Sequence, residues 1–203
     1  MTTYLERPKR GGGNEASLDG GATWRRLMPC LMSAPGNAQK CFDETKTQTR
    51  RIIKQRTRWD QERQCRWPVG TILWIQEPWR VISQWTQARP TQLPNETHVW
   101  YEALNRSATQ DNRISKLRPA RFMPLRFSRP ARYEVIAVKF ERVNEISEAD
   151  ALAEGVTPDL GTNKKWHTLK MGFRKLWNSI HSKPGTRFED APWVFVYEFR
   201  RIK

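Results

Sequence analysis

Tyr133-Glu-Val-Ile-Ala-Val-Lys-Phe-Glu-Arg-Val143 is the stretch that decides the fold, and Asn-Glu-Ile-Ser-Glu-Ala-Asp-Ala-Leu-Ala-Glu-Gly-Val156 follows it directly. Apolar side chains of the first segment alternate between two faces, which is the period of a long central strand. In the second segment Ser147 and Asp150 have the spacing of a helix N-terminal capping box, and Gly155 is a natural stop. The stretch therefore predicts a long strand that leads into a helix of about two turns.

The remaining elements are expected on both sides of this stretch. Short apolar or β-branched runs bounded by turn residues predict strands at Pro29–Ser33, Thr47–Ile53, Thr71–Gln76, Trp79–Trp85, His98–Glu102 and Trp193–Phe199. Apolar positions at helical spacing predict a strong helix over residues 168–181 and a weaker one over 36–45. Several strands with packed helices predict an α+β, mainly β fold, a small pseudo-β-barrel with flanking helices.

The chain length of 203 residues fits one domain with insertions or with a loose tail. Residues 1–26 are polar and Gly-rich without an apolar period, so we expect a disordered basic tail there. Residues 27–203 are expected to form the domain, with insertions near 86–99 and 104–120.

The chain is strongly basic, with 36 Lys and Arg residues against 21 Asp and Glu residues and a net charge of +15. Nucleic acid is the expected partner of so basic a protein, because neutralising its phosphates releases condensed counterions. No run approaches the roughly 18 apolar residues of a transmembrane helix, so no membrane partner is expected. The N-terminus lacks the apolar core of a secretory signal. A cytoplasmic location is therefore expected, which is the host cytoplasm if a phage encodes the chain.

No metal and no cofactor are expected. The three cysteines, Cys30, Cys41 and Cys65, match no zinc spacing and fit a reduced compartment as buried thiols. The histidines are scattered and do not pair with Cys, Asp or Glu at ligand spacing. The chain has no Gly-rich phosphate loop, so nucleoside-triphosphate chemistry is not expected either.

Lys46-Thr-Gln-Thr-Arg-Arg51 is the candidate site motif, read together with the distant Glu154 on the last turn of the predicted short helix. An amine, a hydroxyl and a carboxylate could form a nucleophile with its base and orienter, and they could equally hold a polar ligand such as a nucleobase. In the first interpretation Lys46 is the base or electrostatic activator of the Thr49 hydroxyl. Side chains three residues apart point to opposite faces of a regular strand, so that pair meets only if the backbone bends.

Two basic stretches that contain no acidic residue are candidate phosphate contacts. Residues 46–59 contain six Lys or Arg residues, and residues 112–133 contain seven and no acid. Aromatic side chains in or beside them could stack on unpaired bases, namely Trp59, Trp67, Phe122 and Phe127. The candidate ligand-binding cations are Arg50, Arg51, Lys54, Arg121, Arg126 and Arg129. The other interpretation of each is an ordinary surface ion pair or a weak, unspecific polyanion contact.

Several segments together resemble the ASCH domain family of the PUA-like superfamily, and in particular its phage and prophage members. They are Met28-Pro-Cys-Leu-Met-Ser-Ala-Pro35, Lys46-Thr-Gln-Thr-Arg-Arg-Ile-Ile-Lys54, Pro68-Val-Gly-Thr-Ile-Leu-Trp-Ile-Gln-Glu-Pro-Trp79, the segment 140–156 and Pro192-Trp-Val-Phe-Val-Tyr-Glu-Phe199. The resemblance covers about residues 27–203 with gaps at 86–99 and 104–118. Phe122 departs from it, because phage relatives usually carry His before the Met-Pro step.

The resemblance implies a pseudo-barrel fold that binds RNA, another nucleic acid or a modified nucleoside in a cleft. A small ASCH relative looks like an amidohydrolase acting on N4-acylated cytidine, and its catalytic set falls by motif on Lys46, Thr49 and Glu154. The same alignment favours Arg51 as the arginine that faces the site. Another ASCH protein is associated with ribonuclease activity, so the fold alone does not decide the function.

Three hypotheses therefore follow from the sequence. The first is a protein that binds nucleic acid, with RNA favoured, or a modified nucleoside in a basic cleft. The second is a hydrolase that removes the acyl group from N4-acylated cytidine. The third is a phage factor that interferes with a host nucleic-acid enzyme.

Overall fold

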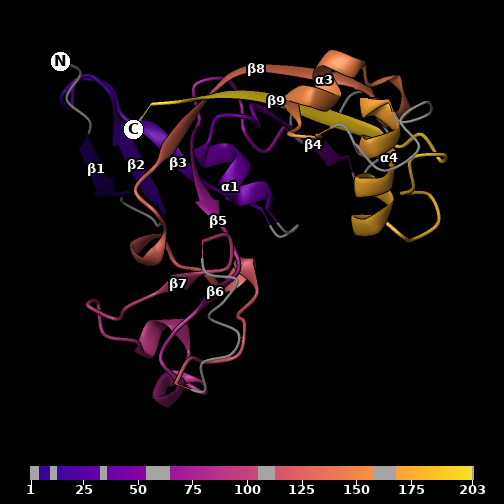
Figure 1. Cartoon of the computed structure of the whole chain (residues 1–203). Helices are drawn as coiled ribbons and strands as arrows, with labels where there is room; N and C mark the ends of the chain where they lie inside the picture. The colour runs from indigo at the N-terminus through magenta and orange to yellow at the C-terminus, as the bar shows by residue number, and fades with distance from the viewer. Residues whose placement is uncertain are drawn as a thin grey trace. The chain divides into compact units, whose positions relative to one another are not determined.

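The computed structural model describes residues 5–9, 13–32, 36–53, 65–104, 113–157 and 168–202 (Figure 1). The chain divides into two compact units. The first unit contains Met1–Phe42, Ile72–Tyr133 and Arg201–Lys203, and the second contains Asp43–Thr71 and Glu134–Arg200. No helix in the described ranges is long and apolar enough to cross a lipid bilayer.

The first unit is built on four strands in the order β1-β2-β3-β5. They are β1 (Leu5–Pro8), β2 (Asn14–Ser17), β3 (Arg25–Leu31) and β5 (Ile72–Gln76). β3 and β5 run parallel, and the short helix α1 (Asn37–Phe42) lies between them in the sequence. A separate ribbon pairs β6 (Trp79–Arg80) with β7 (Trp100–Tyr101).

The described part of residues 1–26 is folded and differs from the expected disordered tail. β2 pairs antiparallel with β3, and Ala16 and Ser17 of β2 are fully buried. The glycines that suggested flexibility make turns, since Gly20 and Gly21 both have positive φ. The Ser17 hydroxyl accepts the Gly21 backbone N–H at 2.8 Å and fixes that turn. Side-chain-to-backbone hydrogen bonds of this kind replace the apolar period that was missing from the sequence.

The segment from β6 to Tyr133 supplies Trp79, Val81, Leu93 and Met123 to an apolar cluster that also contains residues of β2, β3 and β5. Leu93 lies in the expected insertion near 86–99, so this segment contributes to the core of the unit. The predicted strand Trp79–Trp85 is shorter than expected, because Ser83–Trp85 forms a turn of 3₁₀ helix. Of the expected insertion at 104–120, residues 105–112 lie outside the described residues.

The second unit has three strands in the order β8-β9-β4, where β8 is Arg132–Arg142, β9 is Trp193–Arg201 and β4 is Gln48–Ile52. β4 and β9 are antiparallel, with Gln48 opposite Glu198 and Ile52 opposite Val194. The helices α3 (Glu148–Ala153) and α4 (Leu169–Ile180) pack on one face of these strands. That core contains Ile146, Ala151, Phe173, Trp177, Val194 and Val196.

The predicted strand and helix of the opening stretch are confirmed. β8 leads through one turn of 3₁₀ helix into α3, whose N-cap Ser147 accepts the Asp150 N–H at 3.0 Å. The predicted helix 168–181 is α4, which begins after Thr168 and buries Phe173 and Trp177. The α+β, mainly β fold class is confirmed as well. The described strand pairings leave β1 and β4 as open edges, so they do not close a barrel.

Candidate functional site

The backbone around Lys46 is fixed on both sides before β4 begins. The Thr47 N–H donates to the Ala153 carbonyl at 2.8 Å, and the Thr47 carbonyl accepts the Phe199 N–H at 2.8 Å. These bonds join the segment to the end of α3 and to β9. Lys46 is therefore carried into the interior, where its side chain is only 2% exposed.

Lys46 and Glu154, predicted to share a site, form a buried ion pair. Glu154 is the C-cap residue of α3 and its side chain is 6% exposed. The Lys46 ammonium donates to the Glu154 carboxylate, and also to the Glu154 backbone carbonyl at 2.9 Å. The last carbonyls of a helix lack partners within the helix and carry the negative end of its dipole. The ammonium therefore stabilises the end of α3 in addition to pairing with the carboxylate.

Arg50 is the second cation of this site, and its side chain is fully buried. Its guanidinium donates to the Glu141 carboxylate at 2.7 Å and to the Glu154 carboxylate at 3.2 Å. It also lies 3.3 Å from the Asp150 carboxylate. Lys139 completes the group, at 2.9 Å from Asp150 and 3.4 Å from Glu141. We call these six residues the charge network; its members are Lys46, Arg50, Lys139, Glu141, Asp150 and Glu154.

The charge network is electrically balanced, with three cations against three carboxylates. Burial alone raises the pKa of Asp150, but the hydrogen bond from Lys139 and the charges of Lys139 and Arg50 outweigh it and lower that pKa. Burial likewise lowers the pKa of Lys139, and its hydrogen bond to Asp150 and the charge of Glu141 outweigh it and raise that pKa. Both shifts keep the groups charged, which is the behaviour of a structural ion-pair network.

Asp150→Asn should weaken the dependence of stability on acidic pH. A carboxyl whose folded pKa is depressed contributes stability above its unfolded value, and this contribution is lost as pH falls through the folded pKa. The ordinary Asp value is 3.8, so the wild-type loss occurs below about pH 4. The urea midpoints of unfolding of wild type and variant, measured from about pH 2 to about pH 7, should differ near neutrality and converge at the acid end, where carboxylates are protonated. A constant difference at every pH would contradict the assignment.

Thr49 lies on the other face of β4 from Gln48 and Arg50, because side chains alternate along a regular strand. It is 4% exposed and lies opposite Tyr197 of β9. Among the described residues no hydrogen bond joins Lys46 to Thr49, and the Lys46 ammonium is held by Glu154. The backbone bend that the catalytic interpretation needs is therefore not seen in β4, and no contact favours the amidohydrolase hypothesis.

The structure places Arg50, and not Arg51, beside Glu154, and a ligand role of Arg51 stays a prediction. Arg50, on the same face as Gln48, reaches Glu154, whereas the Arg51 guanidinium lies 5.5 Å from the ring centre of Trp67 on the opposite face. Strand alternation places the two arginines on opposite faces, and the position of α3 decides which of them meets Glu154. Lys54 lies outside the described residues.

The three candidate cations of the first unit have different surroundings. Arg129 pairs with the fully buried Glu77 through two hydrogen bonds of 2.7 and 2.9 Å, and it stacks at 3.3 Å on the Phe42 ring. Arg126 is exposed and donates to the Pro90 carbonyl at 2.6 Å. Arg121 is exposed beside Phe122. Arg129 is thus largely buried and paired with Glu77.

Sequence reasoning missed Glu77 and Glu141 as members of ion pairs with buried arginine partners, and it missed the half-exposed Lys139 that pairs with Glu141 and Asp150. A signal was present for Glu141 and Lys139, since both occupy the β8 face opposite Phe140 in an otherwise apolar strand. Glu77 ends the apolar strand β5, which is an unusual place for a carboxylate. Burial raises the pKa of Glu77, and the hydrogen bonds and charge of Arg129 oppose that rise. The partner of each carboxylate is remote in sequence and could not be read from it.

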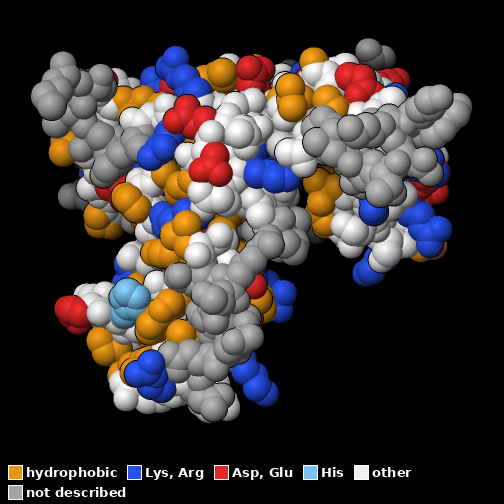
Figure 2. Space-filling view, viewed as in Figure 1, with side chains coloured by type: hydrophobic (Ala, Val, Ile, Leu, Met, Phe, Trp, Pro, Cys, Tyr) orange, Lys and Arg blue, Asp and Glu red, His pale blue; other side chains and the backbone are white. Residues whose placement is uncertain are grey.

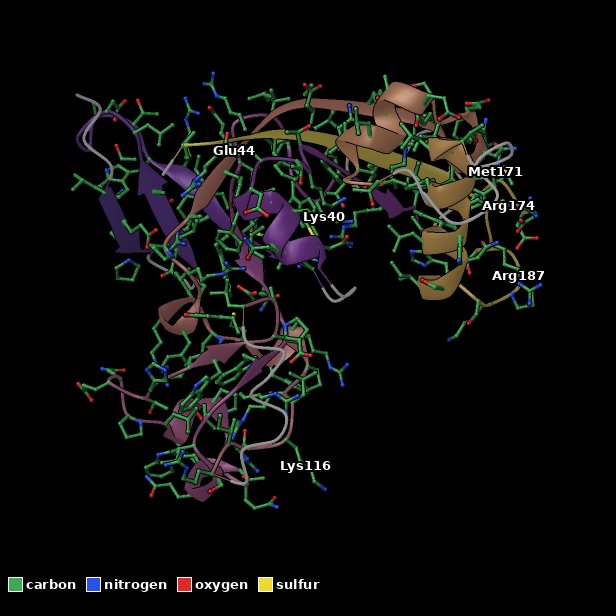
Figure 3. All side chains as sticks on the ribbon, viewed as in Figure 1. Lys40, Glu44, Lys116, Met171, Arg174 and Arg187 are labelled. Carbon is green, nitrogen blue, oxygen red and sulfur yellow. The ribbon has the colours of Figure 1, made fainter. Side chains whose placement is uncertain are left out.

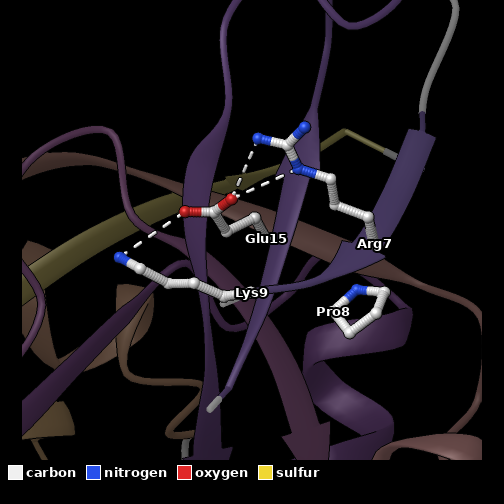
Figure 4. A pocket seen from close by; sticks show the side chains of 4 residues that line it. All are labelled: Arg7, Pro8, Lys9 and Glu15. Carbon is white, nitrogen blue, oxygen red and sulfur yellow. Dashed lines mark hydrogen bonds and ion pairs between the residues drawn. The ribbon is translucent and has the colours of Figure 1, made fainter. Parts of the chain in front are cut away.

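A shallow pocket lies on the N-terminal ribbon, lined by Arg7, Pro8, Lys9 and Glu15 (Figure 4). Glu15 pairs with Arg7 at 3.3 Å and with Lys9 at 3.5 Å, so its carboxylate neutralises much of the positive charge there. Its described lining residues include no nucleophile and no buried acid. It is therefore a weak candidate for a ligand site.

The described residues contain no group of three or more His, Cys, Asp and Glu side chains placed to hold a metal ion. In this part of the chain the three cysteines are free thiols, two of them buried.

No protein-family model matches the chain, and no curated protein matches it either. Two solved structures are similar to it. A protein from Enterococcus faecalis V583 described by the family model DUF984 is 13% identical with a TM-score of 0.43, and the likeness covers 87% of this chain and 77% of that one. An ASCH domain from Lactobacillus crispatus JV V101 is 12% identical with a TM-score of 0.42, covering 86% of this chain and 79% of that one.

An ASCH domain is thus among the structural neighbours of a chain whose sequence resembles that family. A likeness at these identities carries no information on function. The functional argument rests on the residues of this chain.

Proposed function

We propose that the protein binds nucleic acid through an exposed basic surface of its first unit. This surface, named the 113–126 surface, consists of Arg113, Lys116, Arg121, Phe122 and Arg126. The observation that carries the proposal is that these cations and an aromatic ring are exposed together on a segment without any acidic residue.

The structure separates the seven cations of residues 112–133 into two groups. Arg118, Arg129 and Arg132 have internal partners: the Trp85 and Ala88 carbonyls, the Glu77 carboxylate and the Glu6 carboxylate. The remaining four are exposed and belong to the 113–126 surface, and one of them, Arg126, also donates to the Pro90 carbonyl. A dense group of exposed cations without acids attracts phosphate and makes that attraction dependent on salt.

Phe122 adds a second feature that suits nucleic acid. Its side chain is 51% exposed, and the Arg121 guanidinium lies 4.6 Å from its ring centre. An exposed ring beside a guanidinium can stack on an unpaired base while the cation approaches the adjoining phosphate. Trp67 and Phe127, two other predicted stacking residues, are buried in the core, and Trp59 lies outside the described residues.

The charge of the wider surface agrees with this proposal. Figure 2 shows Lys and Arg side chains on the visible face of both units. The Lys116 side chain extends outward from its loop (Figure 3). Several carboxylates of the chain are already paired in the interior, as Glu77, Glu141 and Glu154 are. Each of them is matched by a buried cation, so the net charge of +15 comes from residues outside these pairs.

Binding should therefore weaken steeply with salt, and Arg121→Ala should reduce that slope. The probe is a fluorescein-labelled single-stranded RNA of mixed sequence, titrated by anisotropy at several salt concentrations. Each lost phosphate contact lowers the slope of log K against log salt by about 0.7–1. The control is Lys183→Ala, which removes an exposed cation of the second unit. Wild-type protein that binds neither RNA nor DNA at low salt would refute the proposal, as would an unchanged slope for Arg121→Ala.

A further inference from the structure

The face of the second unit that α3 and α4 leave uncovered carries aromatic side chains. On β8 it presents Phe140 and Arg142, and on β9 it presents Trp193 and the buried Phe195. We call these four residues the aromatic face. Phe140 contacts both β9 rings, with centroids 4.3 Å from Trp193 and 6.2 Å from Phe195, so the residues share one side of the sheet.

The two sides of this sheet differ in charge. Lys139, Glu141 and Arg50 point to the side where α3 lies and belong to the charge network. Alternation along the strands then gives the aromatic face no carboxylate from β8 or β9 between the residues named. Arg51 of β4 also lies on this side, since it is opposite Phe195 in the register. The aromatic face is therefore apolar and cationic.

Trp193 is the centre of the aromatic face. It is 40% exposed, which is unusual for a Trp in a strand beside a packed core. Phe140 stacks on it with an interplanar angle of 5°, and the Arg142 guanidinium lies 4.1 Å from its ring centre. A ring and a guanidinium that close to one centroid must occupy its two opposite faces. The three side chains form a layered arrangement of ring, ring and guanidinium that is open to solvent at its edge.

The backbone holds this arrangement in place. Ala191 adopts a φ of 46°, a conformation that residues with a side chain rarely take. Its carbonyl accepts Arg142 Nη1 at 2.9 Å, and the Pro192 carbonyl accepts the Val143 N–H at 3.1 Å. Uncommon backbone conformations persist where the surrounding structure requires them, and they are frequent at binding sites.

We propose that Trp193 and Phe140 form a stacking site for an unpaired nucleobase, with Arg142 leaving the Trp193 ring to contact the adjoining phosphate. The inference rests on the proposed nucleic-acid binding and extends it to single strands. A base offers the Trp193 face a larger π surface than the guanidinium does, and the displaced guanidinium gains a phosphate partner. Stacking of this kind tolerates any base, so the site selects single strands over duplexes and not one sequence over another.

Charge favours nucleic acid over a protein as the occupant. The chain carries +15, and the aromatic face contains Arg142, has Arg51 of β4 on the same side, and has no carboxylate among its own residues. A polyanion with flat apolar rings complements both properties at once, and single-stranded nucleic acid has this chemistry.

The test compares Trp193→Ala, Trp193→Phe and the control Ile136→Ala in the full chain. Ile136 is a 38% exposed residue of the same strand, β8, so its truncation removes exposed apolar area without removing a ring. The probes are a labelled single-stranded RNA and a duplex of equal length. Trp193→Ala should weaken single-strand binding about 10-fold. Trp193→Phe should recover most of it, because a Phe ring also stacks. Ile136→Ala, and all three variants on the duplex, should match wild type.

The failures of the two proposals are distinguishable. Wild-type protein that binds no nucleic acid overturns the proposed function and this inference with it. Wild-type protein that binds RNA, together with a Trp193→Ala variant of equal single-strand affinity, overturns the stacking site alone. Light scattering that shows a wild-type dimer and a Trp193→Ala monomer would assign the aromatic face to a second copy of the chain, and also overturns it.

Discussion

Glu154→Ala should lower the free energy of unfolding by about 3–5 kcal/mol, because it leaves two buried cations without their shared carboxylate. Lys46 is 2% exposed and Arg50 fully buried, so water cannot replace the lost partner. The Glu154 carboxylate is the group that links them, through the Lys46 ammonium and the Arg50 Nη1. Urea unfolding followed by far-UV circular dichroism measures the change.

The matched control is Glu189→Ala. Glu189 also pairs with an arginine, Arg174, but both side chains are about half exposed. An exposed pair contributes little, so this variant should unfold almost as wild type does. Equal losses for the two variants would show that the charge network is solvated.

Substitutions at Glu154 and Thr49 separate a structural role of the charge network from a catalytic one. If Lys46, Thr49 and Glu154 formed a hydrolytic set, Glu154→Gln and Thr49→Ala would both abolish turnover of acylated cytidines in otherwise folded protein. The geometry predicts instead that Glu154→Gln loses stability and that Thr49→Ala shows no catalytic deficit, since the Lys46 ammonium is bound to Glu154.

The local elements of the fold could be predicted, because their signals are local. The alternation of residues 133–143 and the spacing of Ser147 and Asp150 each specify structure within a few residues, and β8 and α3 follow. The division into two units could not be predicted in this way. It depends on which strands pair across long sequence separations, such as β3 with β5 and β4 with β9.

The candidate site shows the same limit. The sequence indicated that Lys46 and Glu154 belong together, although they are 108 positions apart, because the family resemblance supplied the pairing. Which of Arg50 and Arg51 contacts Glu154 could not be read from it, because that depends on which face of β4 meets α3. The short tail strands were missed because hydrogen-bonded glycine turns, and no apolar period, define them.

Arg129→Ala should lower the free energy of unfolding by about 3–5 kcal/mol, because it leaves the fully buried Glu77 carboxylate without its cationic partner in the interior of the first unit. Arg129 supplies two hydrogen bonds to that carboxylate and a third, at 3.1 Å, to the Gln39 side chain. Its guanidinium also covers the Phe42 ring. An alanine side chain can make none of these hydrogen bonds and cannot cover the Phe42 ring.

The pH dependence of this loss gives a sharper test than its size. Burial already raises the pKa of Glu77, and Arg129 opposes the rise, so removing Arg129 should raise that pKa further. A carboxyl with a raised folded pKa contributes stability below its unfolded value and loses it as pH rises through the folded value. The deficit of Arg129→Ala should therefore be small near pH 4, about the ordinary Glu value, and grow toward neutrality.

The control for Arg129→Ala is Arg121→Ala, which removes an exposed cation from the same unit and should leave stability nearly unchanged at every pH. The effects of the two substitutions on RNA binding should be the reverse of their effects on stability. Arg121→Ala should lower the salt slope of RNA binding, whereas Arg129→Ala, measured where it is folded, should keep it. An Arg129→Ala variant as stable as wild type but with a reduced salt slope would return Arg129 to the nucleic-acid surface. Its exposure of 11%, against the open position of Arg121, argues that the buried Glu77 is its partner.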